Sequence, residues 1–180
     1  MEAMVQQALA FGFSQAAVLS MDTLVLREEV RDMCSADKCR KYGKSWVCPP
    51  ACGTLEHNRA ALTAHKDGLI VQTTGTLEDD FDYEGMQAAG ALHQRRLREF
   101  YRQLRVACPG TVALGSGGCS LCEKCTYPDA PCRFPAEAMV SMEAYGLWVS
   151  DVCTRNGIAY NYGPQTITYT GCYLFPKGEE

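Results

Sequence analysis

Eleven cysteines in a chain of 180 residues restrict its fold more than any other feature of the sequence. Eight of them lie in two short segments, 34–52 and 119–132, whose glycines, prolines and charged residues are typical of loops. The odd total leaves at least one thiol unpaired in any scheme of disulfides. Only three histidines are present, none of them within either segment, which disfavours a mixed Cys/His zinc finger. The pattern therefore indicates a core that carries two loops in which thiolates bind metal.

Charge and hydropathy narrow the class of protein. The formal net charge of −4 argues against a general binder of nucleic acid or of anionic membranes, because both need a field of Lys and Arg. No stretch approaches the roughly 18 uninterrupted apolar residues of a membrane-spanning helix. Met1 to Leu9 lack the basic start of a secretory signal. We expect a cytoplasmic protein, where the reducing environment disfavours disulfides.

Helical periodicity and short runs typical of buried strands alternate along the chain. The expected helices cover 1–12, 23–33, 54–66, 83–106 and a stretch from 135 or 141 to 156. The expected strands cover 15–20, 68–74, 111–114 and 166–175. We predict an α/β fold, a small mixed sheet of about four strands with flanking helices and two cysteine-rich metal-binding loops, in a single domain over 1–180.

The second segment has the more specific spacing. Cys119, Cys122 and Cys125 are each separated by two residues, and Cys132 follows after six more. Three thiolates on so short an arc fit three corners of a cubane iron–sulfur cluster, with a more distant cysteine on the fourth. A single zinc ion fits less well, because structural zinc sites usually combine two separated Cys-x-x-Cys pairs. We predict a [4Fe–4S] cluster here, with zinc as the alternative.

The first segment contains Cys34, Cys39, Cys48 and Cys52, whose spacing alone is less specific. Four basic residues between 38 and 44 oppose a single acid in this otherwise acidic protein. Nearby cations stabilise the negative charge of a thiolate-bound cluster and raise its reduction potential. We therefore predict a second cluster, although a solvated basic loop or a docking patch for an acidic partner would explain the same charges. The spacing does not decide whether Cys48 or Cys132 instead binds the cluster of the other set.

Several residues beside the cysteines are candidates for contact with a cofactor. The Gly-Ser-Gly-Gly run at 115–118 either directs backbone N–H groups at cluster sulfurs or forms an ordinary turn. Bulky side chains in the two segments would shield a cluster from water, although packing is their default role. The predicted cofactor-contacting residues are Lys44, Trp46, Gly117, Gly118 and Arg133.

Four further residues lie outside the predicted ligand sets. Glu143 follows the second segment and is either a proton relay or a charge at the N-terminal end of a helix. Cys108, Cys153 and Cys172 lie outside both segments, and we expect them to be buried, inert thiols and not ligands.

Three motifs resemble those of an uncharacterised bacterial and archaeal family of small, cysteine-rich, predicted metal-binding proteins. They are Cys39-Arg-Lys-Tyr-Gly-Lys-Ser-Trp-Val-Cys48-Pro-Pro, Cys119-x-x-Cys122-x-x-Cys125, and Cys132-Arg133-Phe-Pro leading to Ser141-Met-Glu-Ala-Tyr-Gly146. The likeness covers most of the chain. It implies a metal, for which iron–sulfur is our interpretation, but it implies no reaction.

The chain has no Gly-x-Gly-x-x-Gly turn, no P-loop and no His-Glu-x-x-His pair. Two [4Fe–4S] clusters without these motifs favour single-electron transfer to or from a partner redox protein. We expect such a protein to be oxygen-sensitive and to bind neither nucleic acid nor membrane. The sequence is compatible with a homodimer. One alternative is an oxidoreductase, a cluster-dependent reductase or activating enzyme that acts on a substrate. A second is a zinc-stabilised binding module without redox activity.

Overall fold

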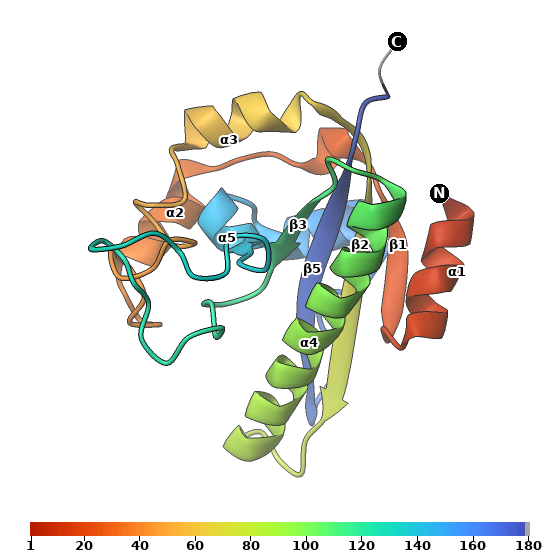
Figure 1. The fold of residues 1–180 in the computed structure, drawn as a ribbon. Helices are drawn as coiled ribbons and strands as arrows, with labels where there is room; N and C mark the ends of the chain where they lie inside the picture. Colours follow the sequence, from red (N-terminus) through yellow and green to blue (C-terminus); the bar gives the residue numbers. More distant parts are fainter. Residues whose placement is uncertain (179–180) are drawn as a thin grey trace.

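The computed structural model describes residues 1–178, and residues 179–180 at the end of the predicted domain lie outside the described part (Figure 1). The helices are α1 (Glu2–Phe11), the 3₁₀ turn η1 (Met21–Thr23), α2 (Glu28–Ser35), α3 (Leu55–Leu62), α4 (Tyr83–Ala107), α5 (Met142–Tyr145) and α6 (Val149–Arg155). The strands are β1 (Gln15–Leu19), β2 (His65–Thr76), β3 (Val112–Gly115), β4 (Val140–Ser141) and β5 (Thr166–Pro176).

The predicted mixed α/β fold is confirmed, and the sheet within the described residues has five strands in the order β1-β2-β5-β3-β4. Four of them match the expected strands. The fifth, β4, is only two residues long and pairs in parallel with β3, Leu114 opposite Val140 and Gly115 opposite Ser141. A strand so short carries no periodicity of its own, so the sequence pattern could not predict it.

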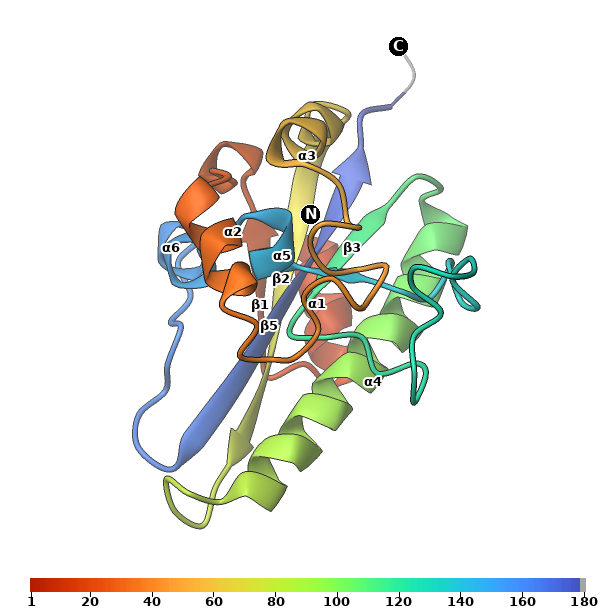
Figure 2. The same ribbon diagram turned by 90° about the vertical axis from the view of Figure 1, so that its left-hand side faces the viewer.

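Helices cover both faces of the sheet. Figure 2 shows α4 on one side of the strands and α2, α5 and α6 on the other. Alternate residues of β2 face opposite ways: Leu69 and Val71 pack with Leu97 and Phe100 of α4, whereas Ile70 joins the core under α5 and α6. All three β2 residues are completely buried. This two-sided burial explains the continuous apolar run in the strand.

Three expected helices have different boundaries. The stretch after 141 is two short helices, because Gly146 adopts φ +107° and a Cβ there would lie 2.4 Å from Leu55 Cδ2. The helix expected over 23–33 begins only at Glu28, since Leu26 forms a β-bridge with Leu147. The helix expected over 54–66 ends at Leu62, since β2 already begins at His65.

No helix in residues 1–178 combines the length and the apolar character needed to cross a bilayer.

Candidate metal centre

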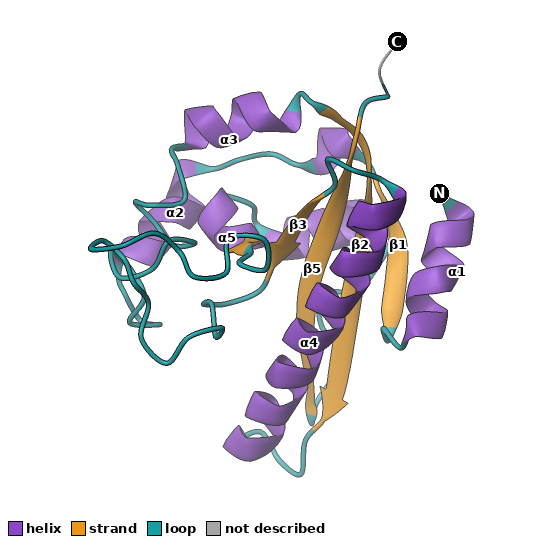
Figure 3. Ribbon diagram, viewed as in Figure 1, coloured by secondary structure: helices purple, strands orange, loops and turns teal. Residues whose placement is uncertain are grey.

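The two cysteine segments lie side by side although 66 residues, 53–118, lie between them in the sequence. The first segment joins α2 to α3, and the second joins β3 to β4; both are irregular and gather on one side of the molecule (Figure 3). Trp46 Nε1 donates a hydrogen bond to the Ala130 carbonyl at 3.0 Å, and the Trp46 ring meets Tyr127 edge-on at 4.9 Å between centroids. The fold therefore brings the two sets of thiols into one region.

Thiols of the first set surround a cavity of about 160 Å³, which we call the first cysteine cavity. Its lining includes Cys34, Cys39 and Cys48, together with Gly117 and Glu143. Among the described residues Cys52 is not part of this lining, and its Sγ donates to the Ala144 carbonyl at 3.6 Å. Three of the four predicted ligands of this set thus face one space.

All four thiols of the second set line a second cysteine cavity, of about 20 Å³. They are Cys119, Cys122, Cys125 and Cys132. This volume is close to that of a single water. Insertion of a cluster there requires the loop to open, and the loop from β3 to β4 has no helix or strand that would resist the movement.

The two cavities share a wall. Gly118 lines the first cavity and Cys119 the second; likewise Cys48 lines the first and Val47 the second. Consecutive Cα atoms are only about 3.8 Å apart, so little more than the thickness of one backbone separates the two spaces at these points. Cys48 and Cys132 each line the cavity of their own set. In this arrangement neither cysteine would be a ligand in the other set's site.

Burial dominates the electrostatics of the first set. It raises the pKa of Cys34, and the charges of Glu143 and Cys39 raise it further, whereas Arg31 lowers it. Burial raises the pKa of Cys48 to about 11, and a hydrogen bond from Ser45 lowers it in part. Burial also raises the pKa of Cys52. Without metal these thiols are therefore protonated at neutral pH, and binding of a cation must displace protons.

Cys125 in the second set behaves differently. Partial burial raises its pKa, but backbone N–H groups of Tyr127, Trp46 and Thr126 and the Ser45 hydroxyl outweigh that effect, so the pKa is lowered overall. Burial raises the pKa of Cys119 in the same cavity. Hydrogen bonds to a sulfur stabilise its negative charge whether it is free or bound to metal.

Ser45 links the two sets. Its side chain is buried, its Oγ accepts a hydrogen bond from the Val47 N–H at 3.4 Å, and it lowers the pKa of Cys48 in the first set and of Cys125 in the second. Sequence reasoning missed this residue, because serine is common in loops and its two partners belong to segments far apart in the chain.

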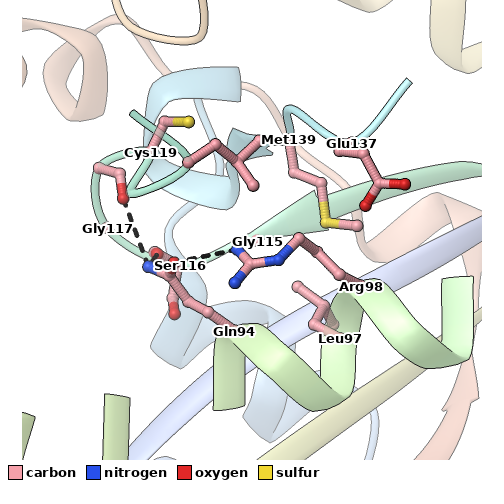
Figure 4. A pocket seen from close by; sticks show the side chains of 11 residues that line it. Gln94, Leu97, Arg98, Gly115, Ser116, Gly117, Cys119, Glu137 and Met139 are labelled. Carbon is pink, nitrogen blue, oxygen red and sulfur yellow. Dashed lines mark hydrogen bonds between the residues drawn. The ribbon is translucent and has the colours of Figure 1, made fainter. Parts of the chain in front are cut away.

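The glycine-rich turn is anchored to α4 by Gln94, as Figure 4 shows. Gln94 Nε2 donates to the carbonyls of Ser116 at 3.4 Å and Gly118 at 3.3 Å, and its Oε1 accepts from Ser120 Oγ at 2.6 Å. Gly117 adopts φ +65°, where glycine is favoured. The turn therefore has a defined position on the wall of the first cavity, and Gln94 is a second residue that the sequence did not indicate.

The other predicted cofactor-contacting residues lie at different distances from the thiols. Trp46 and Arg133 line the second cavity, where Arg133 Nη1 also donates to the Lys124 carbonyl at 3.0 Å. Lys44 lines neither cavity within the described residues; its Nζ forms an ion pair with Asp37 Oδ2 at 2.9 Å on the surface. Lys41 is the basic residue of the first segment that lines the second cavity.

The remaining cysteines lie away from both cavities. Cys153 and Cys172 are completely buried in the core under α5 and α6, as expected for inert thiols, whereas Cys108 is only half-buried at the end of α4. All eleven cysteines are free thiols. Within residues 1–178 no three Cys, His, Asp or Glu side chains converge closely enough to hold one metal ion.

Comparison with known proteins gives one match. Residues 17–175 match the model of a family described as "Predicted metal-binding protein (DUF2284)". No curated protein and no solved structure matches the chain. The matched range contains both cysteine segments and both cavities, and the description assigns metal binding without a reaction or a particular metal.

Proposed function

Because the chain belongs to this family of predicted metal-binding proteins, we propose that its two cysteine sets hold two [4Fe–4S] clusters and that it exchanges single electrons with a partner redox protein. One observation carries the proposal: thiols from two distant segments line two cavities that share a wall. Two redox cofactors at such a short distance exchange electrons readily. A pair of purely structural zinc sites does not need to be this close.

The donor types that line the two cavities fit the chemistry of this group, and the described thiols must move closer together to bind it. Cys119, Cys122, Cys125 and Cys132 would hold one cluster; Cys34, Cys39 and Cys48 would hold the other with a fourth donor. Clusters of this type supply reversible one-electron transfer. The chain's part is to stabilise the added charge, for which the second cavity provides the N–H groups around Cys125 and the Ser45 hydroxyl.

The second cavity is the better candidate for contact with a partner. Cys132 lines both this cavity and an open hollow of about 490 Å³ on the surface, bounded by Trp46, Pro128 and Pro135 among others. The first cavity lies against the Ser141 end of β4 and the start of α5. We infer that electrons enter or leave through the second site.

A cluster-dependent reductase is the second candidate. Glu143 lines the first cavity and also an open hollow of about 250 Å³, which Met33, Trp148 and Tyr160 help to form. A small substrate in that hollow would lie next to the first site. Turnover of a small-molecule electron acceptor by the dithionite-reduced protein alone would favour the reductase; reduction of the acceptor only through a partner protein favours the carrier.

Metal and sulfide analysis tests the proposal. Protein purified without exposure to air should be brown, contain iron and inorganic sulfide, bleach with dithionite and give an EPR signal when reduced. Cys122→Ser should lower the iron content, whereas the same substitution at Cys108, which lines neither cavity in the described chain, should not. Zinc without iron would reject the clusters and leave the zinc-stabilised binding module.

The same proposal places the protein in the cytoplasm, since a reducing compartment keeps all eleven thiols available for metal. Its expected partner is a redox protein, and neither nucleic acid nor a membrane is required. A homodimer is compatible with it, and sedimentation of the loaded protein would determine the oligomeric state.

A further inference from the structure

The side chain of Glu143 has an unsatisfied atom beside the first cysteine cavity. Its Oε2 is buried and has no hydrogen-bond partner in residues 1–178. Burial raises the pKa of this carboxyl, and the backbone N–H of Glu143 and the Ser141 hydroxyl offset that effect in part. A buried polar atom without a partner loses its hydration and gains nothing in return, so native proteins rarely keep one unless a ligand satisfies it.

The residues around the cavity leave one ligand position without a thiol. Cys34, Cys39 and Cys48 line the cavity with Glu143, whereas the Sγ of Cys52 is directed to the Ala144 carbonyl at 3.6 Å. A cubane cluster needs four protein ligands for full coordination. Glu143 is therefore the one carboxylate among the described residues that line this space, and Cys52 has another partner.

The position of Glu143 is fixed by contacts on every side of α5. Ser141 Oγ caps the helix by accepting the Ala144 N–H at 3.1 Å. Arg31 Nη1 donates to the Ala144 carbonyl at 3.0 Å, and Asn58 Nδ2 donates to the Tyr145 carbonyl at 3.2 Å. The carboxyl thus lies in the cavity wall because three elements of the fold, through Ser141, Arg31 and Asn58, hold the backbone of the helix there.

On the basis of the proposed iron–sulfur function, we propose that Glu143, in place of Cys52, supplies the fourth protein ligand of the first cluster. A carboxylate carries the same single negative charge as a thiolate and is an accepted ligand of iron. Coordination through Oε2 would satisfy the atom that the protein alone leaves without a partner. The first cluster then differs from the second, which has four thiolates, in one oxygen ligand.

Reconstitution of substituted proteins with iron and sulfide under anoxic conditions tests this ligand set. Glu143→Ala should lower the iron and sulfide content about twofold, as expected when one of two clusters is lost. Cys34→Ser should have the same effect. Cys52→Ser should retain the full content, because the serine hydroxyl can still donate to the Ala144 carbonyl. Glu28→Gln is the matched control, an exposed acid on α2, and should match the wild type.

A spectroscopic measurement separates ligation from a structural role. Mössbauer spectra of the ⁵⁷Fe-loaded wild type should show one iron site with the larger isomer shift of oxygen coordination. Glu143→Gln, which keeps the shape of the side chain, should remove that site, and circular dichroism should show the wild-type fold.

The outcomes also separate this inference from the function on which it rests. Loss of one cluster in Cys52→Ser, with full content in Glu143→Ala, would overturn the ligand assignment and leave the two clusters in place. A wild type without inorganic sulfide would overturn the clusters themselves.

Discussion

At the scale of single residues, Ser45 has the largest expected effect on redox behaviour. Its hydroxyl lowers the pKa of Cys48 in one set and of Cys125 in the other, and groups that stabilise negative charge on ligand sulfurs favour the reduced, more negative state of a cluster. Ser45→Ala should therefore lower the reduction potentials, by an amount on the order of tens of millivolts. Potentiometric titration followed by EPR would measure the shift.

Two substitutions control this prediction. Ser45→Thr keeps a hydroxyl, so its reduction potentials should stay close to those of the wild type. Ser35→Ala removes an exposed hydroxyl that donates to the Asp32 carbonyl, next to Cys34 in sequence, and should leave both potentials unchanged. Equal potentials in Ser45→Ala and the wild type would show that the hydroxyl does not act on the clusters.

The sequence predicted the residues whose chemistry is visible in their spacing. The cysteines of both sets were identified in this way, and seven of the eight line the two cavities. Ser45, Gln94 and Arg31 could not be found, because each acts through partners in distant segments and its residue type has no special spacing. Glu143 was noticed, but its place beside Cys34 depends on the pairing of β4 with β3.

At the scale of elements, α4 is attached to the sheet by a row of apolar side chains. Leu97 is 2% exposed and packs in the core between the helix and strands β2 and β5. Leu97→Ala should lower the free energy of unfolding by about 2–5 kcal/mol, through lost burial and the cavity left behind. Val106→Ala on the same helix is the control: Val106 is 82% exposed, so denaturant titration should show little change.

The same helix carries a buried imidazole that makes stability depend on pH. His93 Nδ1 lies 3.1 Å from Thr73 Oγ1, and its Nε2 has no partner among the described residues. Burial, with a smaller effect of Arg96, lowers its pKa from 6.5 to about 3. Below pH 6.5 the unfolded chain therefore binds a proton that the folded protein does not.

The free energy of unfolding should consequently fall as the pH is lowered from 6.5 toward 3. The contribution of this group approaches a slope of about 1.4 kcal/mol per pH unit. Denaturant titrations at several pH values between 6.5 and 5 would measure this dependence. The free energy of unfolding of His93→Gln should change less with pH than that of the wild type. His57→Gln, at an exposed site on α3, should retain the wild-type slope. Parallel curves for His93→Gln and the wild type would exclude the effect.

Elements with a strong periodic pattern were predictable, and elements that depend on tertiary contacts were not. The long α4 and the buried strands β2 and β5 follow from periodicity and apolar runs. Boundaries of the short helices do not, because Gly146 breaks its helix where Leu55 approaches, and β4 exists only through its pairing with β3. Those elements adjoin the first cavity, so the least predictable part of the fold is the part that positions Glu143.

At the scale of the whole molecule, the core and the metal-binding loops are separate sources of stability. Both core clusters are built from helices and strands, and neither includes a residue of the two cysteine segments. The sheet should therefore persist without metal, whereas the loops have few apolar contacts to hold them. Local stability in proteins varies in this way between packed elements and poorly packed loops.

Removal of metal should loosen the two loops and leave the sheet intact. Hydrogen exchange followed by mass spectrometry should show faster exchange in 36–54 and 116–139 after chelation, with unchanged protection of β2 and β5. Uptake of metal should release protons and weaken as the pH falls, because burial raises the pKa of Cys34, Cys48 and Cys119, and each must lose its proton to bind. Global loss of protection on chelation would instead show that the fold requires its metal, as it does in small zinc-dependent domains.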